Sequence, residues 1–289
     1  MRGRGHSDLT RRTGQGGRWG RFAVKEWCLN SWVPVPCNMI QDLYILTGAS
    51  RGMGLAMAEQ LIRGNHFVLC ISRNTNEALA SRAAKLDGKL EQWPLDLEHS
   101  VQAAAMLAQW LGSRKTGSFA SATLINNAGV IPRIGPLSAS DPIDLTRALR
   151  VGLEAPLLLT AAFLRVTEPW HIPRKVLNIS SGLGRRALAS QAGYCAAKAG
   201  MDHFTRCLAL DEALKPHGAK VCSLAPGVID TDMQMQLRSA DASAFPDQKN
   251  FIDLKLKGQL TSSADAATQV LTYLARPDFG RNPIGDVRD

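Results

Sequence analysis

The fold of this chain is decided by YILTGASRGMG, residues 44–54, in which a short apolar run enters a glycine-rich turn. The glycines follow the spacing G-x-x-x-G-x-G, and apolar residues then recur at helical intervals over residues 55–62. Glycines between a strand and a helix let the backbone turn tightly and let the helix N-terminus approach a diphosphate. The turn therefore predicts a dinucleotide cofactor, with contacts from Gly48, Ser50, Arg51, Gly52, Met53 and Gly54.

The hydrophobic pattern beyond this turn alternates between strand-like runs and helical stretches. Further strands are predicted at residues 66–71, 90–95, 123–125, 176–179 and 221–224, and further helices at 77–86, 101–111, 142–166 and 192–214. This alternation predicts an α/β fold, a single Rossmann-type doubly wound parallel sheet with helices on both faces. The alternation stops at residues 227–260, which are expected to form an irregular substrate loop after the strand at 221–224.

The composition is that of a globular chain, since 45% of the 289 residues are hydrophobic and 20% are charged. No apolar run reaches the roughly 18 residues that a membrane-spanning helix needs. The net charge of +9 is concentrated in residues 1–38, where seven basic residues face two acidic ones. The net charge of +4 on the remaining residues does not indicate a polyanionic partner such as nucleic acid, although it suits an anionic cofactor. We therefore expect a soluble protein without a nucleic-acid or membrane partner.

The first 38 residues differ from the rest, because they are rich in Gly and Arg and show no sustained helical or strand period. This basic extension is interpreted as a disordered tail, as an arm that adds to the fold, or as sequence upstream of a true start at Met39. The third interpretation is favoured. A mitochondrial presequence fits less well, because Asp8 and Glu26 interrupt it and Ser is scarce. One domain is expected over residues 39–289.

The six cysteines form no C-x-x-C pair, and none lies at metal-ligand spacing from a histidine, so no metal site is predicted. Cys70 and Cys222 fall inside apolar strand-like runs and are expected in the core. No signal peptide is recognised, and a reducing cytoplasm is the expected compartment.

A candidate reacting centre follows the predicted strand at 176–179. Tyr194 lies thirteen residues after Ser181 and four before Lys198, and the four-residue spacing places the tyrosine and the lysine on one helix face. A nearby ammonium stabilises a phenolate and lowers the pKa of the phenol, so Tyr194 is expected to donate a proton to a developing alkoxide. Ser181 is expected to donate a hydrogen bond to the same oxygen. We predict these three residues as catalytic, with Ser181 and Tyr194 also contacting the substrate.

The choice between NAD and NADP depends on the end of the predicted strand at 66–71. An acidic residue there would accept hydrogen bonds from a free ribose 2′-hydroxyl, but the sequence continues Ser72-Arg73-Asn74 without a carboxylate. Arg73 and Arg51 can instead hold a 2′-phosphate through charge-assisted hydrogen bonds, the alternative being two solvated surface arginines. Together they predict NADP (NADPH) as the cofactor, with Asn74 beside it.

Taken together, these motifs resemble the short-chain dehydrogenase/reductase family. The matching elements follow the family's order and spacing: residues 47–54, 96–97, 126–129, 178–181, 194–198 and 226–231. The resemblance implies adenine contacts from Asp96 and Leu97, and an adenosine ribose beside Asn127, Ala128 and Gly129. It also implies cofactor contacts from Tyr194, Lys198, Pro226 and Gly227, and a nicotinamide end held by Val228 and Thr231. Finally, it implies a homo-oligomer, most often a dimer through the helices at 142–166 and 192–214.

The C-terminal third is similar to a narrower group, the sepiapterin reductases and the bacterial benzil reductases. The matching segments are residues 230–234, 256–260 and 285–289. This similarity implies that Asp286 anchors the guanidine-like edge of a pterin; the alternative is a chain-end aspartate in water. Gly152 departs from the family, which usually has at this helix position an Asn that helps to hold a proton-relaying water. The helix is then rearranged, another group holds the water, or turnover is slow.

These observations favour an NADPH-dependent carbonyl reductase that transfers hydride to a ketone, either a vicinal diketone or an α-hydroxyketone. The alternative is a cofactor-binding protein with little or no catalysis, acting as a redox-sensing or interaction module. Gly152 is the only support for that alternative. The complete trio of Ser181, Tyr194 and Lys198 favours the enzyme, because a binding module has no chemical need for it.

Overall fold

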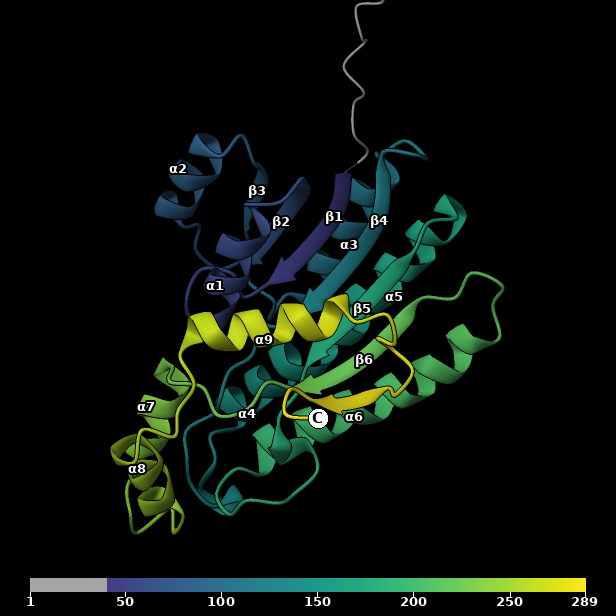
Figure 1. Ribbon diagram of the computed structural model, residues 1–289. Helices are drawn as coiled ribbons and strands as arrows, with labels where there is room; N and C mark the ends of the chain where they lie inside the picture. The colour runs from purple at the N-terminus through teal and green to yellow at the C-terminus, as the bar shows by residue number, and fades with distance from the viewer. Residues whose placement is uncertain (1–40) are drawn as a thin grey trace, which may run out of the picture. The chain divides into compact units, whose positions relative to one another are not determined.

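The computed structural model describes residues 41–289 (Figure 1). The extension at residues 1–38 and the start at Met39 lie outside the described residues. In the described part, parallel strands form a seven-stranded sheet in the order β3-β2-β1-β4-β5-β6-β7. The strands are β1 (Gln41–Thr47), β2 (His66–Ser72), β3 (Lys89–Pro94), β4 (Phe119–Asn126), β5 (Arg174–Ile179), β6 (Lys220–Ala225) and β7 (Ile284–Asp286).

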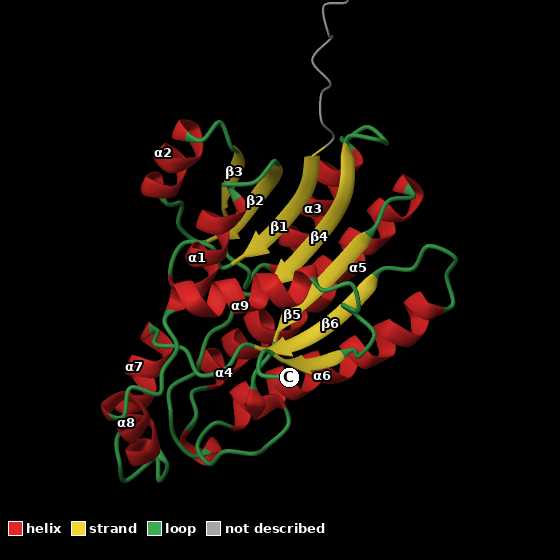
Figure 2. Cartoon of the chain, viewed as in Figure 1, coloured by secondary structure: helices red, strands yellow, loops and turns green. Residues whose placement is uncertain are grey.

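Helices cover both faces of this sheet, as Figure 2 shows. The main helices are α1 (Gly52–Leu61), α2 (Glu77–Lys85), α3 (Ser100–Gly112), α4 (Pro142–Leu149), α5 (Ala155–Thr167), α6 (Ala192–Ala213), α7 (Asp232–Arg238), α8 (Gln248–Leu256) and α9 (Ser263–Ala275). Several begin at residues suited to that position. The side chain of Asn76 caps α2, Asp141 caps α4 ahead of Pro142, and Ser262 caps α9. The doubly wound α/β fold predicted from the sequence is confirmed.

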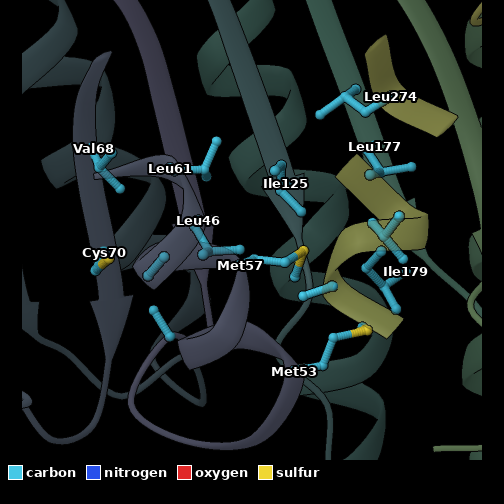
Figure 3. Packing of buried hydrophobic residues seen from close by; sticks show 14 of the residues in the cluster. Leu46, Met53, Met57, Leu61, Val68, Cys70, Ile125, Leu177, Ile179 and Leu274 are labelled. Carbon is cyan, nitrogen blue, oxygen red and sulfur yellow. The ribbon is translucent and has the colours of Figure 1, made fainter. Parts of the chain in front are cut away.

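Each face of the sheet carries its own apolar core, because successive side chains along a strand point to opposite faces. On one face, Leu46 and Leu177 pack with side chains of α1 and α9 (Figure 3). On the other face, Ile45 and Leu124 pack with side chains of α3 and α5. Strands buried on both faces read as continuous apolar runs, which is why the sequence reveals them. Cys70 and Cys222 are buried, as expected.

Three predicted features need correction. The helix expected over residues 142–166 is interrupted by a π-helical turn, Arg150–Glu154, which separates α4 from α5. The segment expected to be irregular, residues 227–260, contains α7 and α8. These helices escaped prediction because they are short, and α8 buries no residue that would create an apolar stripe. The structure also adds α9 and β7, which the alternation did not predict.

The topology predicts a ligand-binding crevice beyond the carboxyl ends of the strands. The chain runs outward from β1 through β2 to β3, and then returns to pair β4 with the other side of β1. In open parallel sheets, ligands bind beyond the carboxyl ends of the strands at such a reversal. Among the described residues, no helix is long and apolar enough to cross a membrane.

Candidate active site

A cavity of about 930 Å³ lies at the carboxyl ends of the strands. It brings together the three candidate catalytic residues and the ends of β1, β2, β4, β5 and β6. Its lining includes almost every residue that the sequence analysis singled out: Gly48, Ser50, Arg51, Gly52, Met53, Gly54, Arg73, Asp96, Leu97, Asn127, Ala128, Gly129, Ser181, Tyr194, Lys198, Pro226, Gly227, Val228, Thr231 and Asp286. Asn74 alone among these candidates is not part of the lining.

The glycine-rich turn packs too closely against the rest of the protein to hold side chains at Gly48 and Gly54. Gly48 has a φ of +70°, and a Cβ built on Gly54 would lie 2.1 Å from the carbonyl oxygen of Gly48. The Thr47 hydroxyl accepts hydrogen bonds from the backbone N–H groups of Asn127 (2.9 Å) and Ala128 (3.0 Å). The Asn127 side chain donates in return to the Thr47 carbonyl at 3.0 Å. These hydrogen bonds hold the turn against the end of β4. The first residues of α1 line the cavity, and the N-terminus of a helix suits a diphosphate.

The residues expected beside the adenosine ribose, which follow β1 and β2, differ in their availability to a ligand. Arg73 is exposed and lines the cavity. Arg51 also lines it but forms an ion pair with Asp232 at 2.7 Å, with the two side chains 70% and 62% exposed. The Asn74 carbonyl accepts a hydrogen bond from the Ser72 hydroxyl, and nearby Asn76 is held by Gln92 and caps α2. The arginines therefore line the site, whereas Asn74 belongs to the turn that follows β2.

The three catalytic candidates meet where β5 ends and α6 begins. Tyr194 and Lys198 are buried on α6, one turn apart. The Lys198 ammonium donates to the carbonyl of Ile179, the last residue of β5, at 2.7 Å, and lies 5.8 Å from the centre of the Tyr194 ring. Ser181 follows β5, and its hydroxyl accepts a hydrogen bond from the Leu183 N–H at 3.2 Å. The structure thus brings a phenol, a hydroxyl and an ammonium to the wall of one cavity.

Burial has the largest effect on the pKa values of Tyr194 and Lys198. It raises the pKa of Tyr194 to about 12, partly offset by the interaction with the Ser181 hydroxyl. It lowers the pKa of Lys198 to about 8, while the Asp202 carboxylate acts in the opposite direction. The expectation that the ammonium lowers the pKa of Tyr194 is not met here, because desolvation of the phenolate is the larger effect. At neutral pH Tyr194 holds its proton, which is the state that a proton donor needs.

An ion pair between Asp202 and Arg185 lies next to Lys198 along α6. Asp202 is one turn further along α6 and only 1% exposed. Its carboxylate accepts hydrogen bonds from the Ser223 hydroxyl at 2.6 Å and from Arg185 Nε at 3.1 Å. Arg185 also donates to the carbonyl of Gly285 in β7 at 2.8 Å. This ion pair links α6, the loop after Ser181 and the two strands at the sheet edge.

Asp286 occupies the end of β7, and its carboxylate is already paired. Arg288 donates to both carboxylate oxygens at 2.6 Å, through Nε and Nη2. Hydrogen bonds from Arg288 hold the pKa of Asp286 below its usual value. Asp286 is 8% exposed, so it is not a chain-end aspartate lying in water. The guanidinium of this chain itself occupies the place where a guanidine-like ligand edge was expected.

Gly152 lies inside the π-helical turn between α4 and α5. A Cβ at this position would lie 3.1 Å from the Cβ of Ala197, the residue before Lys198. The helix at this departure from the family pattern is therefore locally widened, and its backbone packs closely against α6.

Sequence reasoning missed several residues that line the cavity, among them Arg186, Gln191, Gln234, Phe251 and Arg288. Gln191 and Gln234 are buried, and the Oε1 atom of each has no hydrogen-bond partner within the described part of the chain. Gln191 follows Ser190, whose φ of +63° is unusual for a residue other than Gly. The position of Gln191 one turn before Tyr194 is a signal that the sequence did offer. Residues 41–289 contain no cluster of side chains that could hold a metal ion.

Comparison with known proteins agrees with this geometry. Residues 43–242 match the short chain dehydrogenase family, which covers more than half of the chain. The chain belongs to that family, whose members are oxidoreductases that bind nicotinamide cofactors.

The relatives also bear out the narrower resemblance. A benzil reductase ((S)-benzoin forming) of Bacillus cereus is 33% identical over 243 residues, covering 84% of this chain and 96% of the relative. A sepiapterin reductase of Xenopus tropicalis is 34% identical over 248 residues, covering 80% and 90%. Among solved structures, a short-chain dehydrogenase/reductase from Burkholderia vietnamiensis is 34% identical with a TM-score of 0.58, covering 86% of this chain and 98% of that protein.

Proposed function

We propose that this chain is an NADPH-dependent carbonyl reductase that reduces one carbonyl of a vicinal diketone or an α-hydroxyketone. The proposal is carried by one observation: Ser181, Tyr194 and Lys198 line the same cavity as a glycine turn that has no room for side chains. The similarity to a benzil reductase and a sepiapterin reductase supports the substrate class. A pure binding module would need the turn but not the trio.

The residues fit a nicotinamide dinucleotide, because Gly48, Gly52 and Gly54 line the cavity at the start of α1, where a helix N-terminus can hold a diphosphate. The bound cofactor supplies the hydride that reduces the carbonyl carbon. Tyr194 is protonated at neutral pH and donates its proton to the carbonyl oxygen as negative charge develops there. The Ser181 hydroxyl donates a hydrogen bond to the same oxygen. Lys198, charged below its pKa of about 8, stabilises the phenolate that remains.

The proposed preference for NADPH over NADH rests on two arginines, one directly after β2 and one at the start of α1. Arg73 is exposed, lines the cavity, and has no acidic residue immediately beside it in sequence. Arg51 adds a second guanidinium, which a 2′-phosphate must draw away from Asp232. Charge-assisted hydrogen bonds from two guanidinium groups favour a phosphate over a hydroxyl.

The test is a steady-state assay that follows NADPH consumption with benzil, diacetyl, sepiapterin and isatin, repeated with NADH. We expect turnover with NADPH and a diketone. Tyr194→Phe should lower turnover by about 10²–10⁴-fold, the typical contribution of general acid catalysis, with little change in NADPH affinity. Tyr44→Phe is the matched control, because Tyr44 lines a different cavity with His66 and Lys175. Retention of most activity by a folded Tyr194→Phe variant would point to another proton donor.

We further propose that the chain acts in the cytoplasm as a homodimer through α5 and α6. Leu157 on α5 is 43% exposed, and Leu210 on α6 is 71% exposed. Apolar positions that one sheet face cannot cover suit a second copy of the same helices. Light scattering at micromolar concentration should give a dimer, and a monomer would contradict this arrangement.

A further inference from the structure

We propose that Asp202 is a positioning residue that holds Lys198 in its ammonium form, and that Arg185 sets how strongly the Asp202 charge acts on Lys198. This inference deepens the proposed function and rests on it, since it concerns the same reacting centre. Neither residue lines the cavity, so neither is expected to touch the substrate or the cofactor.

Two hydrogen bonds hold the Asp202 carboxylate in one orientation, one helical turn from Lys198. Lys198 and Asp202 are one turn apart on α6, where side chains four residues apart are neighbours. Lys198 is 4% exposed and Asp202 is 1% exposed, so water screens this pair only weakly. One carboxylate oxygen accepts from the Ser223 hydroxyl at 2.6 Å and the other from Arg185 Nε at 3.1 Å. A buried carboxylate with a hydrogen bond to each oxygen stays one helical turn from Lys198 and outside the cavity.

Arg185 is anchored independently of this carboxylate. Its Nη2 donates to the Gly285 carbonyl at 2.8 Å, and its side chain is 30% exposed. The guanidinium therefore stays in place when Asp202 changes, and it neutralises part of the negative charge that Lys198 experiences. The two residues act on Lys198 with opposite signs.

Other charged and titratable groups around the pair are few within the described residues. Tyr194 faces Lys198 from the same helix. The Cys222 thiol on β6 interacts with both Asp202 and Arg185, and burial raises its pKa to about 11, so it stays neutral. Asp286 on β7 lies within the influence of Arg185, but Arg288 already pairs with it. Asp202 is therefore the carboxylate that opposes the effect of burial on Lys198.

Loss of the Asp202 charge and loss of the Arg185 charge are expected to shift the pH profile in opposite directions. Removal of a nearby negative charge makes a proton easier to lose, and it does so for both Lys198 and Tyr194. Asp202→Asn should therefore move the alkaline limb of the pH profile to lower pH. Removal of the Arg185 charge leaves Asp202 unopposed, so Arg185→Gln should move the same limb to higher pH. A purely structural ion pair predicts lower stability for both variants and no shift in either direction.

The experiment measures kcat/KM for NADPH-dependent reduction of diacetyl as a function of pH in the wild type, Asp202→Asn and Arg185→Gln. Thermal unfolding and NADPH affinity of each variant verify that it is folded. We expect shifts of about one pH unit in opposite directions, at the low end of what an adjacent charge produces. Limbs that stay in place, or that move in the same direction, would overturn the inference.

Two further outcomes are decisive. If Asp202→Asn does not fold, the Arg185→Gln variant still tests the inference, because the Arg185 side chain is partly exposed. A shift of its alkaline limb to higher pH supports the inference, and a limb that stays in place overturns it. If the wild type reduces none of benzil, diacetyl, sepiapterin and isatin, the proposed function fails and this inference fails with it. If the wild type is active but the alkaline limbs of both variants stay in place, the inference about Asp202 and Arg185 fails and the proposed function stands.

Discussion

The substitution Gly54→Ala tests whether the glycine turn is as tightly built as the structure indicates. The added Cβ would lie 2.1 Å from the Gly48 carbonyl oxygen and 2.5 Å from the Asn127 amide nitrogen, so the backbone must shift. Overpacking of this kind typically costs about 1–3 kcal/mol, and a rigid backbone neighbour favours the upper end. Replacement of a helical Gly by Ala regains about 1 kcal/mol. The net loss of about 2 kcal/mol corresponds to a Tm lower by roughly 4–8 °C in a domain of this size.

Gly112→Ala is the matched control for this substitution. Gly112 closes α3, and a Cβ there would meet nothing within 4 Å. The same chemical change should therefore leave the Tm equal or raise it by roughly 2–4 °C, since the gain in helix propensity is up to about 1 kcal/mol.

Circular dichroism melting and NADPH fluorescence titration supply the two readouts for this pair of variants. We expect Gly54→Ala to weaken NADPH binding by at least about tenfold, which corresponds to 1.4 kcal/mol, because the displaced carbonyl borders the cavity. Gly112→Ala should bind NADPH as the wild type does. A Gly54→Ala protein that matches the wild type in both Tm and NADPH affinity would refute this account of the turn.

The remaining predictions concern specificity. Arg73→Ala should weaken NADPH binding about tenfold and leave NADH binding unchanged. One charged hydrogen bond contributes about 1.5–3 kcal/mol, and the exposure of this site favours the low end. Fluorescence titration with both cofactors measures the two affinities, and an equal loss for both would contradict this prediction. Asp232→Asn should tighten NADPH binding severalfold by releasing Arg51, and the same titration would expose a failure as weaker binding. Arg288→Ala should raise kcat/KM for sepiapterin relative to diacetyl by freeing the Asp286 carboxylate, and an unchanged ratio would argue against Asp286 as a substrate contact.

Much of the fold was visible in the sequence because it depends on local pattern. The strand predicted at residues 66–71 lies within β2, whose central residues are buried on both faces and therefore form an unbroken apolar run. By contrast, β7 has three residues, too few to show any period. The helix α9 did carry a usable signal, since Ser262 caps it and Asp265 stands in its first turn.

The site was predictable where a motif fixes the backbone, and less so where distant side chains meet. The spacing of Ser181, Tyr194 and Lys198 indicated a shared site, and the structure places all three on one cavity. The link between Arg185 and Gly285 joins residues a hundred positions apart, so no local pattern reveals it. The direction of the Tyr194 pKa shift was also beyond the sequence, because it depends on how deeply the phenol is buried.

The packing of α9 on α1 has a consequence for how the molecule is assembled. Met57 of α1 and Val270 of α9 belong to one core cluster, and Gln60 donates to the Ala264 carbonyl, 204 positions later, at 3.2 Å. The helix that begins at the glycine turn thus stays partly uncovered until residues near 270 have folded against it. A fragment that stops after β4 should expose this apolar face and aggregate, although it contains the whole glycine turn. We therefore expect nucleotide binding to require the complete domain with α9 in place, and an amino-terminal half transferred to another protein to lack it.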